Sequence, residues 1–200
     1  MQGDLFPVNE TLRDQASEIP GFSLRRDYVT PEEELVLVAH VDQGPWETDW
    51  RRRIQQYGLG YAAGHGKQAS WIRDLPEWLV PLATRVAKDA GFERLPENSV
   101  INEYIPPLGI GPHRDYSTFG PTIACVSLGS DIVMEFSHPE RGLRLPVYVP
   151  VRSLWVITSE ARSEWRHAIA SRFTDIVNGK RRPRGRRISV TFRTAARPRG

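Results

Sequence analysis

The chain has 200 residues, of which 40% are hydrophobic and 26% charged, and its formal net charge is +3. This length and composition predict a globular protein with a real apolar core, and no apolar run is long enough to cross a bilayer. The single cysteine, Cys125, excludes an internal disulfide framework, and the first ten residues lack the pattern of a secretory signal, so a cytoplasmic protein is expected.

The N-terminal half predicts two helices with a short strand between them. One helix is expected after Thr30, whose side chain can cap it while Glu33 completes a capping box. Residues 51–66, RRRIQQYGLGYAAGHG, predict a short strand that leads into a glycine-rich turn. Residues 74–92 predict the second helix, in which Pro81 marks either a kink or a later start.

From Ser99 onward the sequence changes to short β-rich runs separated by Gly, Pro, Asp and Ser. These runs are SVINEYI, TIACVSLG, DIVMEFSH, LRLPVYVP, SLWVITS and RRISVTFRT. Their length and spacing predict an antiparallel sandwich, jelly roll or barrel. Because helices come first and strands follow, the expected class is α+β.

A basic run lies near the C-terminus. Six of the eight residues in 180–187, KRRPRGRR, are Lys or Arg. Such a run can contact the phosphates of a nucleic acid. It can equally be a solvated loop that charge keeps soluble. The sequence alone favours neither interpretation.

A candidate metal pair lies in the segment NEYIPPLGIGPHRDYSTFGP, residues 102–121. His113 and Asp115 are one residue apart, and alternate residues of an extended segment point to the same side. The pair alone is a weak signal, so a third ligand must come from a distant strand. His138 and His167 are the candidates, and His138 is interpreted as a surface residue because it precedes a proline in an expected hairpin turn. Two histidines and one carboxylate are typical of non-haem Fe(II) oxygenases.

The last β-rich run is a second polar pattern, with strict alternation of side chains. One face of the expected strand carries Arg187, Ser189, Thr191 and Arg193. An arginine that points into a barrel needs an anion there, and a dicarboxylate cosubstrate would suit a guanidinium. The alternative is that this is the solvent face of an edge strand. Asn102 and Tyr104 alternate in the same way, as cosubstrate contacts or ordinary polar positions.

These motifs, in this order, resemble the AlkB-like family of Fe(II)/2-oxoglutarate dioxygenases. The motifs are N-x-Y at 102–104, H-x-D at 113–115, SLGS, SEARSEWRH ending at 167, and R-x-S-x-T-x-R at 187–193. The resemblance runs from about Pro20 to Arg193. SLGSDIVMEF followed by HP is similar to the branch that hydroxylates modified wobble uridines in tRNA. The extra RNA-binding and methyltransferase domains of that branch are not expected within these 200 residues.

The resemblance implies an α+β fold, a double-stranded β-helix (jelly-roll) core with N-terminal helices packed on it. One domain over 1–200 would hold helices and a substrate lid in 1–95, the core in 96–194 and a tail in 195–200. The implied cofactors are Fe(II), 2-oxoglutarate and O2. By the same resemblance, the iron ligands and catalytic residues would be His113, Asp115 and His167.

The resemblance also implies the contacts of the cosubstrate. Arg187 would pair with the distal carboxylate of 2-oxoglutarate, and Asn102 and Tyr104 would assist it. Arg193 would lie near the inner carboxylate and the metal-bound aspartate. Ser189 stands where the family often has Asn, and it keeps a hydrogen-bonding side chain.

The implied reaction is oxidative demethylation of alkylated nucleobases in DNA or RNA, on a flipped or single-stranded base. Tyr57, Tyr61 and Trp71 lie in the lid region, where they could stack on a base or be core aromatics. Ser117 replaces the acidic residue with which DNA-repair members read the base, which leaves the base preference open. The alternatives are hydroxylation of a modified tRNA base, a protein side chain or a small molecule, and a non-catalytic nucleic-acid-binding β-barrel. A monomer that contacts nucleic acid but no membrane is expected.

Overall fold

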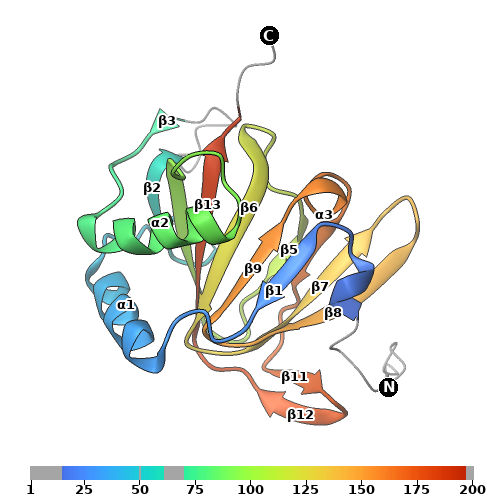
Figure 1. Cartoon of the computed structure of the whole chain (residues 1–200). Coiled ribbons are helices and arrows are strands. Elements are labelled where there is room, and N and C mark those ends of the chain that lie inside the picture. The colour runs from blue at the N-terminus through green and yellow to red at the C-terminus, as the bar shows by residue number, and fades with distance from the viewer. Residues whose placement is uncertain (1–14, 50, 61–69, 197–200) are drawn as a thin grey trace.

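Two antiparallel β-sheets form the body of the molecule (Figure 1). The computed structural model describes residues 15–49, 51–60 and 70–196. Within these ranges, the larger sheet contains, in spatial order, β1 (Phe22–Arg25), β9 (Ser153–Ile157), β6 (Phe119–Leu128), β13 (Arg187–Ala195), β4 (Asn98–Tyr104), β2 (Ile54–Gly60) and β3 (Ser70–Trp71). The smaller sheet contains β5 (Ile110–His113), β10 (Arg166–Ile169), β7 (Ile132–His138) and β8 (Leu143–Val149). A separate hairpin consists of β11 (Thr174–Val177) and β12 (Lys180–Pro183).

An apolar core lies between the two sheets. Alternate residues of a strand share a face, so Ile123 and Trp155 of the larger sheet meet Met134 and Phe136 of the smaller one in one buried cluster. This arrangement confirms the α+β class and the jelly-roll core that the sequence predicted. Its consequence is that the polar residues on these inner faces are enclosed by the two sheets.

The helices lie outside this sandwich. They are η1 (Gln15–Glu18), α1 (Pro31–Gln43), η2 (Glu77–Leu79), α2 (Val80–Asp89) and α3 (Ser159–Ser163). Leu37 of α1 and Val86 of α2 belong to a second buried cluster with Val190 of β13, which shows that both helices cover the outer face of the larger sheet (Figure 1). None of the helices in the described ranges combines the length and apolarity needed to cross a bilayer.

The predicted helix signals are present in the structure. The Thr30 side chain accepts a hydrogen bond from the backbone N–H of Glu33 at 3.1 Å, and the Glu33 carboxylate accepts one from the N–H of Thr30 at 2.9 Å. The capping box is therefore complete. Pro81 sits at the start of α2, after the 3-10 turn η2, which decides for the later start over a kink.

The short strand predicted within residues 51–66 is present as β2, which pairs with β4 in the larger sheet. Several other strands were not predicted. Among them, β1 places another part of the N-terminal half in the larger sheet, where it pairs with β9. β5, β10, β11 and β12 have four residues each, too few to establish a period of two. Pairing partners far away in the sequence stabilise these short segments as strands, and local pattern does not reveal such partners.

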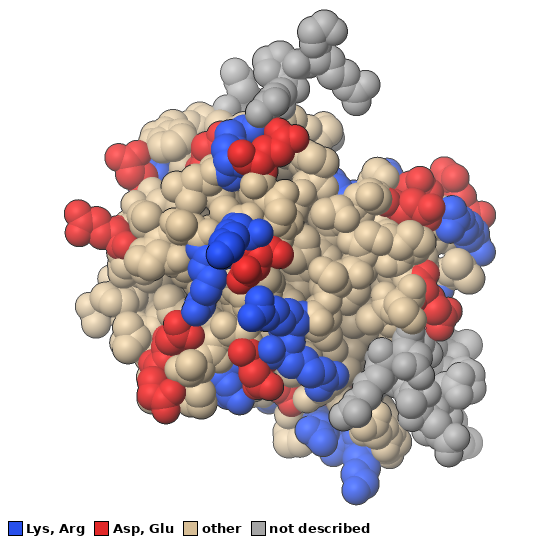
Figure 2. Space-filling view, viewed as in Figure 1, with Lys and Arg blue, Asp and Glu red and all other residues tan. Residues whose placement is uncertain are grey.

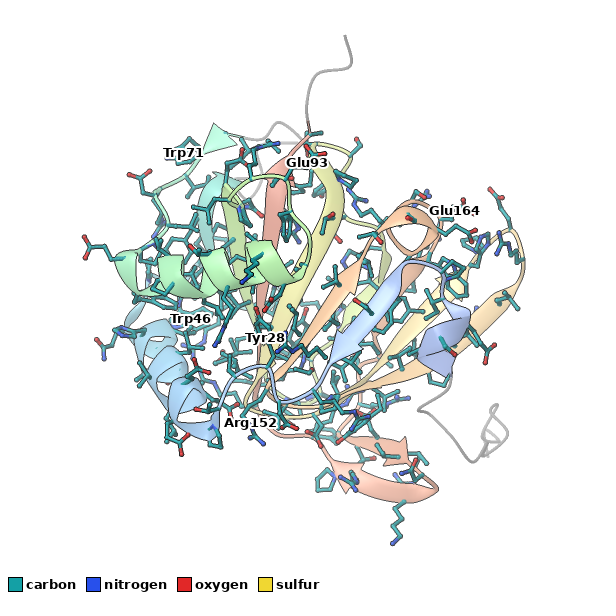
Figure 3. All side chains as sticks on the ribbon, in the orientation of Figure 1. Tyr28, Trp46, Trp71, Glu93, Arg152 and Glu164 are labelled. Carbon is teal, nitrogen blue, oxygen red and sulfur yellow. The ribbon has the colours of Figure 1, made fainter. Side chains whose placement is uncertain are left out.

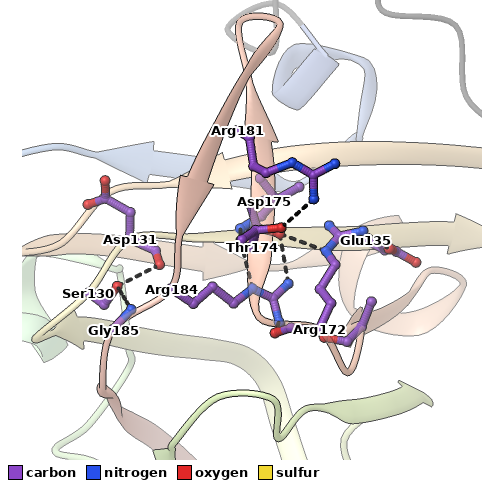
Figure 4. A network of polar contacts seen from close by, with 11 residues as sticks. Ser130, Asp131, Glu135, Arg172, Thr174, Asp175, Arg181, Arg184 and Gly185 are labelled. Carbon is purple, nitrogen blue, oxygen red and sulfur yellow. Dashed lines mark hydrogen bonds and ion pairs between the residues drawn. The ribbon is translucent and has the colours of Figure 1, made fainter. Parts of the chain in front are cut away.

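One buried carboxylate fixes the hairpin to the smaller sheet (Figure 4). Asp175 of β11 accepts hydrogen bonds from Arg172 at 2.8 Å, from two nitrogens of Arg184 at 2.8 Å each, and from the backbone N–H of Val133 in β7 at 3.1 Å. Burial would raise the pKa of Asp175, but these hydrogen bonds and the neighbouring arginines hold the pKa below its ordinary value.

Candidate active site

A cavity of about 320 Å³ opens between the inner faces of the two sheets. Its lining includes Asn102, Tyr104, His113, Asp115, His167, Arg187, Ser189 and Arg193. β4 and β13 pair so that Asn102 lies opposite Ser189 and Tyr104 opposite Arg187. Because alternate side chains of both strands face inward, the two polar patterns meet in one enclosed space.

The two histidines and the aspartate come together at the paired strands β5 and β10. His113 is directly opposite His167, and their ring centroids are 4.4 Å apart. An Asp115 carboxylate oxygen, Oδ2, lies 3.7 Å from Nε2 of His167. His113 Nδ1 is 2.9 Å from the carbonyl oxygen of Gly111. A proton on Nδ1 makes that hydrogen bond and leaves Nε2 with a lone pair for a metal.

The electrostatics of this group suit a cation. Burial would raise the pKa of Asp115, but the charge of Arg193 outweighs it, so the pKa lies well below its usual range. Burial lowers the pKa of His167 to about 4, although Asp115 opposes this shift. At neutral pH the site therefore offers an ionised carboxylate and a neutral imidazole, the protonation states that metal binding requires.

Buried polar atoms without a hydrogen-bond partner mark the same place. In the described part of the chain, Asp115 Oδ2, His167 Nδ1 and the Nε atoms of Arg187 and Arg193 are buried without one. Leaving such atoms unsatisfied typically costs about 1–3 kcal/mol each. Several of them lining one cavity indicate a ligand that satisfies them.

Arg187 is the most unusual charge in the cavity. It is 2% exposed, donates to Ser127 Oγ at 2.8 Å and lies 5.4 Å from the Tyr104 ring centroid. No carboxylate within 4 Å pairs with it among the described residues. A buried guanidinium without a counter-charge is costly, so this end of the cavity is suited to an anion.

Arg193 and Arg162 both contact Asp115, Arg193 at the carboxylate and Arg162 at the backbone carbonyl. Arg193 lies 2.5 Å from Asp115 Oδ1 and donates to Asn98 Oδ1 at 3.1 Å. Arg162 of α3 donates to the backbone carbonyl oxygens of four residues in loop 115–120, at 2.8–3.2 Å. The segment that leads to His167 is thereby tied to the loop that carries Asp115. Arg162 was not predicted as a site residue, because carbonyl binding leaves no signature in residue spacing.

The residues expected to contact the substrate have different locations. Tyr57 is 3% exposed, packs in the helix-side core and donates to Gln55 Oε1 at 2.9 Å. Stacking on a base is therefore wrong for Tyr57, because its side chain is buried in the helix-side core and is not part of the cavity lining. Trp71 is 58% exposed in β3, the edge strand of the larger sheet (Figure 3), and Ser117 lines the cavity mouth. Tyr61 lies outside the described residues.

A wider hollow of about 1000 Å³ forms the mouth of the cavity. Its lining includes three arginines, Arg114, Arg162 and Arg166, together with Tyr116. Tyr116 is 51% exposed and also lines the inner cavity. Tyr116, one residue after Asp115, was not among the predicted site residues. An exposed aromatic ring among cations is a surface on which a base can stack.

His138 is not a surface residue, contrary to the expectation. It is 2% exposed because β7 continues through it before the turn. Its Nδ1 accepts from the backbone N–H of Arg141 at 3.2 Å, and its Nε2 lies 3.1 Å from Glu164. Among the described residues, His138, Glu160 and Glu164 are grouped closely enough to hold an ion. Arg141 lies 3.1 Å from Glu160, and because His138 Nδ1 accepts a hydrogen bond, the proton of the neutral ring is on Nε2, which faces Glu164.

Known proteins are similar to this chain in sequence and in fold. The family model described as the 2OG-Fe(II) oxygenase superfamily matches residues 21–193. An uncharacterised protein of Acanthamoeba polyphaga mimivirus is 35% identical over 185 residues, which cover 90% of this chain and 87% of the relative. The Xenopus tropicalis protein named tRNA (carboxymethyluridine(34)-5-O)-methyltransferase alkbh8 is 30% identical over 79% of this chain. This chain spans 26% of that relative's length.

A solved structure supports the fold independently. The structure of OsALKBH1 superimposes with a TM-score of 0.62 at 14% sequence identity, over 88% of this chain and 98% of that chain. At this identity the likeness concerns the fold alone.

Proposed function

The chain belongs to the 2OG-Fe(II) oxygenase superfamily, as an AlkB-like member that depends on Fe(II), 2-oxoglutarate and O2, and on this premise we propose how its cavity serves the reaction. His113, Asp115 and His167 hold the iron. Arg187 binds the distal carboxylate of 2-oxoglutarate, and Arg193 lies beside the inner end. The observation that carries this assignment is the set of unsatisfied buried atoms, which includes a carboxylate oxygen, an imidazole nitrogen and two guanidinium nitrogens.

These residues fit the groups that the family implies. A carboxylate and two imidazoles are suitable donors for Fe(II), and an unpaired buried guanidinium is suited to a carboxylate. When bound, iron and 2-oxoglutarate supply the oxidation of a C–H bond by O2, with succinate and CO2 as coproducts. The protein orients Asp115 through Arg193 and Arg162, and apolar side chains such as Met134 and Ile169 limit water in the cavity.

The proposed substrate is a base of a nucleic acid. The relative named as a tRNA methyltransferase supports this class, and so do the cations and Tyr116 at the mouth. A base must be flipped or single-stranded to enter such a cavity. Oxidation of an N-methyl carbon would release formaldehyde, and oxidation of another carbon would leave a stable hydroxyl group. The name of that relative favours a tRNA base as the second candidate.

The six basic residues of the run 180–187 have different surroundings. Arg184 and Arg186 pair with acidic side chains, and Arg187 lines the cavity. Lys180, Arg181 and Arg182 are exposed on β12. Of these, Arg181 donates to Thr174 Oγ1 at 3.1 Å, and Arg182 lies 3.9 Å from Asp131. Figure 2 shows positive charge at the tip of this hairpin, at the opposite end of the molecule from α3 and the end of β13 in Figure 1. We propose that these three contact phosphates of a long substrate, far from the reacting base.

Salt dependence tests this contact. Changing Lys180, Arg181 and Arg182 to Gln should lower the slope of log affinity against log salt for tRNA by about 2, because each lost phosphate contact removes roughly 0.7–0.9. Turnover of a short oligonucleotide should not change.

A matched variant changes three exposed basic residues elsewhere to Gln, namely Arg51, Lys88 and Arg144. The net charge falls equally, so an equal loss of slope in both variants would show a general charge effect and contradict a specific contact.

The first experiment is succinate formation by the purified protein with Fe(II), 2-oxoglutarate and O2. It is run with and without methylated single-stranded DNA, methylated RNA and tRNA, and formaldehyde is assayed in parallel. Stimulation by one polymer identifies the substrate class, and formaldehyde distinguishes demethylation from stable hydroxylation. Turnover that no polymer stimulates would overturn the nucleic-acid substrate. Asp115→Ala should abolish metal binding and turnover, and full activity of that variant would contradict the ligand assignment.

A further inference from the structure

Arg52, just before β2, lies at the end of the cavity that contains Tyr104 and Arg187. Its Nε donates to Asn102 Oδ1 at 3.0 Å. Its guanidinium carbon is 5.4 Å from the Tyr104 ring centroid, and that of Arg187 is also 5.4 Å from the same ring. Two guanidinium groups therefore lie against one buried aromatic ring, and both line the cavity.

The neighbours of Arg52 in the sequence have other surroundings. Arg53 forms an ion pair with the buried carboxylate of Glu103, and Arg51 is exposed to solvent. Arg52 has no carboxylate within ion-pair distance in the ranges that the structure describes. Its position beside the cavity therefore does not come from an ion pair within the protein.

The charges that line the cavity are unbalanced at this end. Asp115 is the carboxylate among the described lining residues, and Arg193 already lies 2.5 Å from it. Arg52 and Arg187 are left without a counter-ion, although Arg187 is buried. A ligand group with negative charge would lower the cost of this arrangement.

The hydrogen bond from Arg52 also fixes the chemistry of Asn102. Guanidinium nitrogens only donate, so the Asn102 atom that accepts from Arg52 must be the amide oxygen. The amide nitrogen of Asn102, with two protons, remains for another partner. Arg52 thus sets Asn102 as a donor, which suits a carboxylate oxygen at this end of the cavity.

We propose that Arg52 is a second cationic residue of the 2-oxoglutarate site, which binds the distal carboxylate together with Arg187 and holds Asn102 as a donor. The inference rests on the proposed function, because it assumes that 2-oxoglutarate occupies this cavity. On this proposal, Arg52 and Arg187 together set the preference of the site for a dicarboxylate.

Binding of two 2-oxo acids to the Mn(II)-loaded protein tests the proposal without turnover. 2-Oxoglutarate has a distal carboxylate, and 2-oxobutyrate has none. Arg52→Met should weaken 2-oxoglutarate about 10- to 100-fold in calorimetric titration, in line with loss of a charge-assisted contact. The affinity for 2-oxobutyrate should not change. Arg51→Met, which removes the adjacent exposed arginine, should bind both ligands like the unmodified chain.

Other outcomes of this titration separate an error in the role of Arg52 from an error in the proposed function. Equal 2-oxoglutarate affinities of Arg52→Met and Arg51→Met would overturn the role of Arg52 while the proposed function stands. Equal weakening of both 2-oxo acids by Arg52→Met would overturn a distal-carboxylate contact. Absence of 2-oxoglutarate binding to the unmodified Mn(II) protein would overturn the proposed cosubstrate site itself. Arg52→Lys keeps the charge but cannot reproduce the Nε geometry, so full affinity in that variant would contradict the positioning of Asn102.

Discussion

Two arginines, Arg184 and Arg187, should respond in opposite ways to the same substitution. Arg187 is 2% exposed and has no carboxylate partner among the described residues, whereas the Arg184 side chain is 3% exposed and binds Asp175 through two nitrogens. We predict that Arg184→Met destabilises the protein strongly. Arg187→Met should leave the cofactor-free protein as stable as before, or more stable, and should abolish 2-oxoglutarate binding.

The magnitudes follow from the contacts of each residue. Arg184→Met leaves the Asp175 carboxylate buried with fewer partners, which costs roughly 3–5 kcal/mol. Arg187→Met loses one hydrogen bond to Ser127 and one contact with the Tyr104 ring, together about 2–4 kcal/mol. Removal of an uncompensated buried charge stabilises the folded protein by a similar free energy. The net change for Arg187→Met should therefore lie within about 1 kcal/mol of zero or be favourable.

Urea unfolding measures both effects when it is carried out on two samples, one with a chelator and one without chelator but with Mn(II) and 2-oxoglutarate. Saturating 2-oxoglutarate at 100 times its dissociation constant should stabilise the unmodified protein by about 2.7 kcal/mol. It should not stabilise Arg187→Met. Without ligand, an equal loss of stability in Arg187→Met and Arg184→Met would refute this prediction. Tight binding of 2-oxoglutarate by Arg187→Met would also refute it.

Three further predictions concern other polar residues. Arg162→Lys should weaken Mn(II) about tenfold, because the loop that carries Asp115 loses its four-carbonyl anchor; unchanged calorimetric affinity would contradict this. His138→Ala should cost about 2 kcal/mol of stability in urea without changing metal stoichiometry, and loss of the metal would mean that the wrong histidine is assigned to iron. Acid should destabilise the protein. Burial would raise the pKa values of Asp175 and Glu103, but their arginine partners hold them below the ordinary 3.8 and 4.5. This stabilisation is complete above those values and is lost as the pH falls through the lower folded ones, so a free energy of unfolding that stays constant below about pH 4.5 would argue against it.

The local patterns of the sequence were informative where side-chain alternation decides the outcome. H-x-D at 113–115 and R-x-S-x-T-x-R at 187–193 predicted side chains that share one side of an extended chain, and the structure places both sets along one cavity. The capping box at Thr30 was equally local, because both of its partners lie within one turn. Alternation of side chains and a three-residue spacing can both be read from the amino-acid sequence without knowledge of the fold.

Tertiary packing decided what depends on partners far apart in the chain. The basic run divides into exposed and inward residues because Asp175 and Glu103 meet Arg184 and Arg186. Tyr57 is buried because the helices cover its side of β2.

The sequence by itself determined the pairs of side chains that can act together, since neighbouring residues fix their relative direction. Only the tertiary structure decided which pairs meet across the two sheets, because that meeting depends on strand pairing between distant segments. The contacts of Arg52 with Asn102 and of Arg162 with loop 115–120 span about fifty residues of chain, and no local pattern records them. Burial and counter-charge, which decide the chemistry of each group, arise only when those segments pack together.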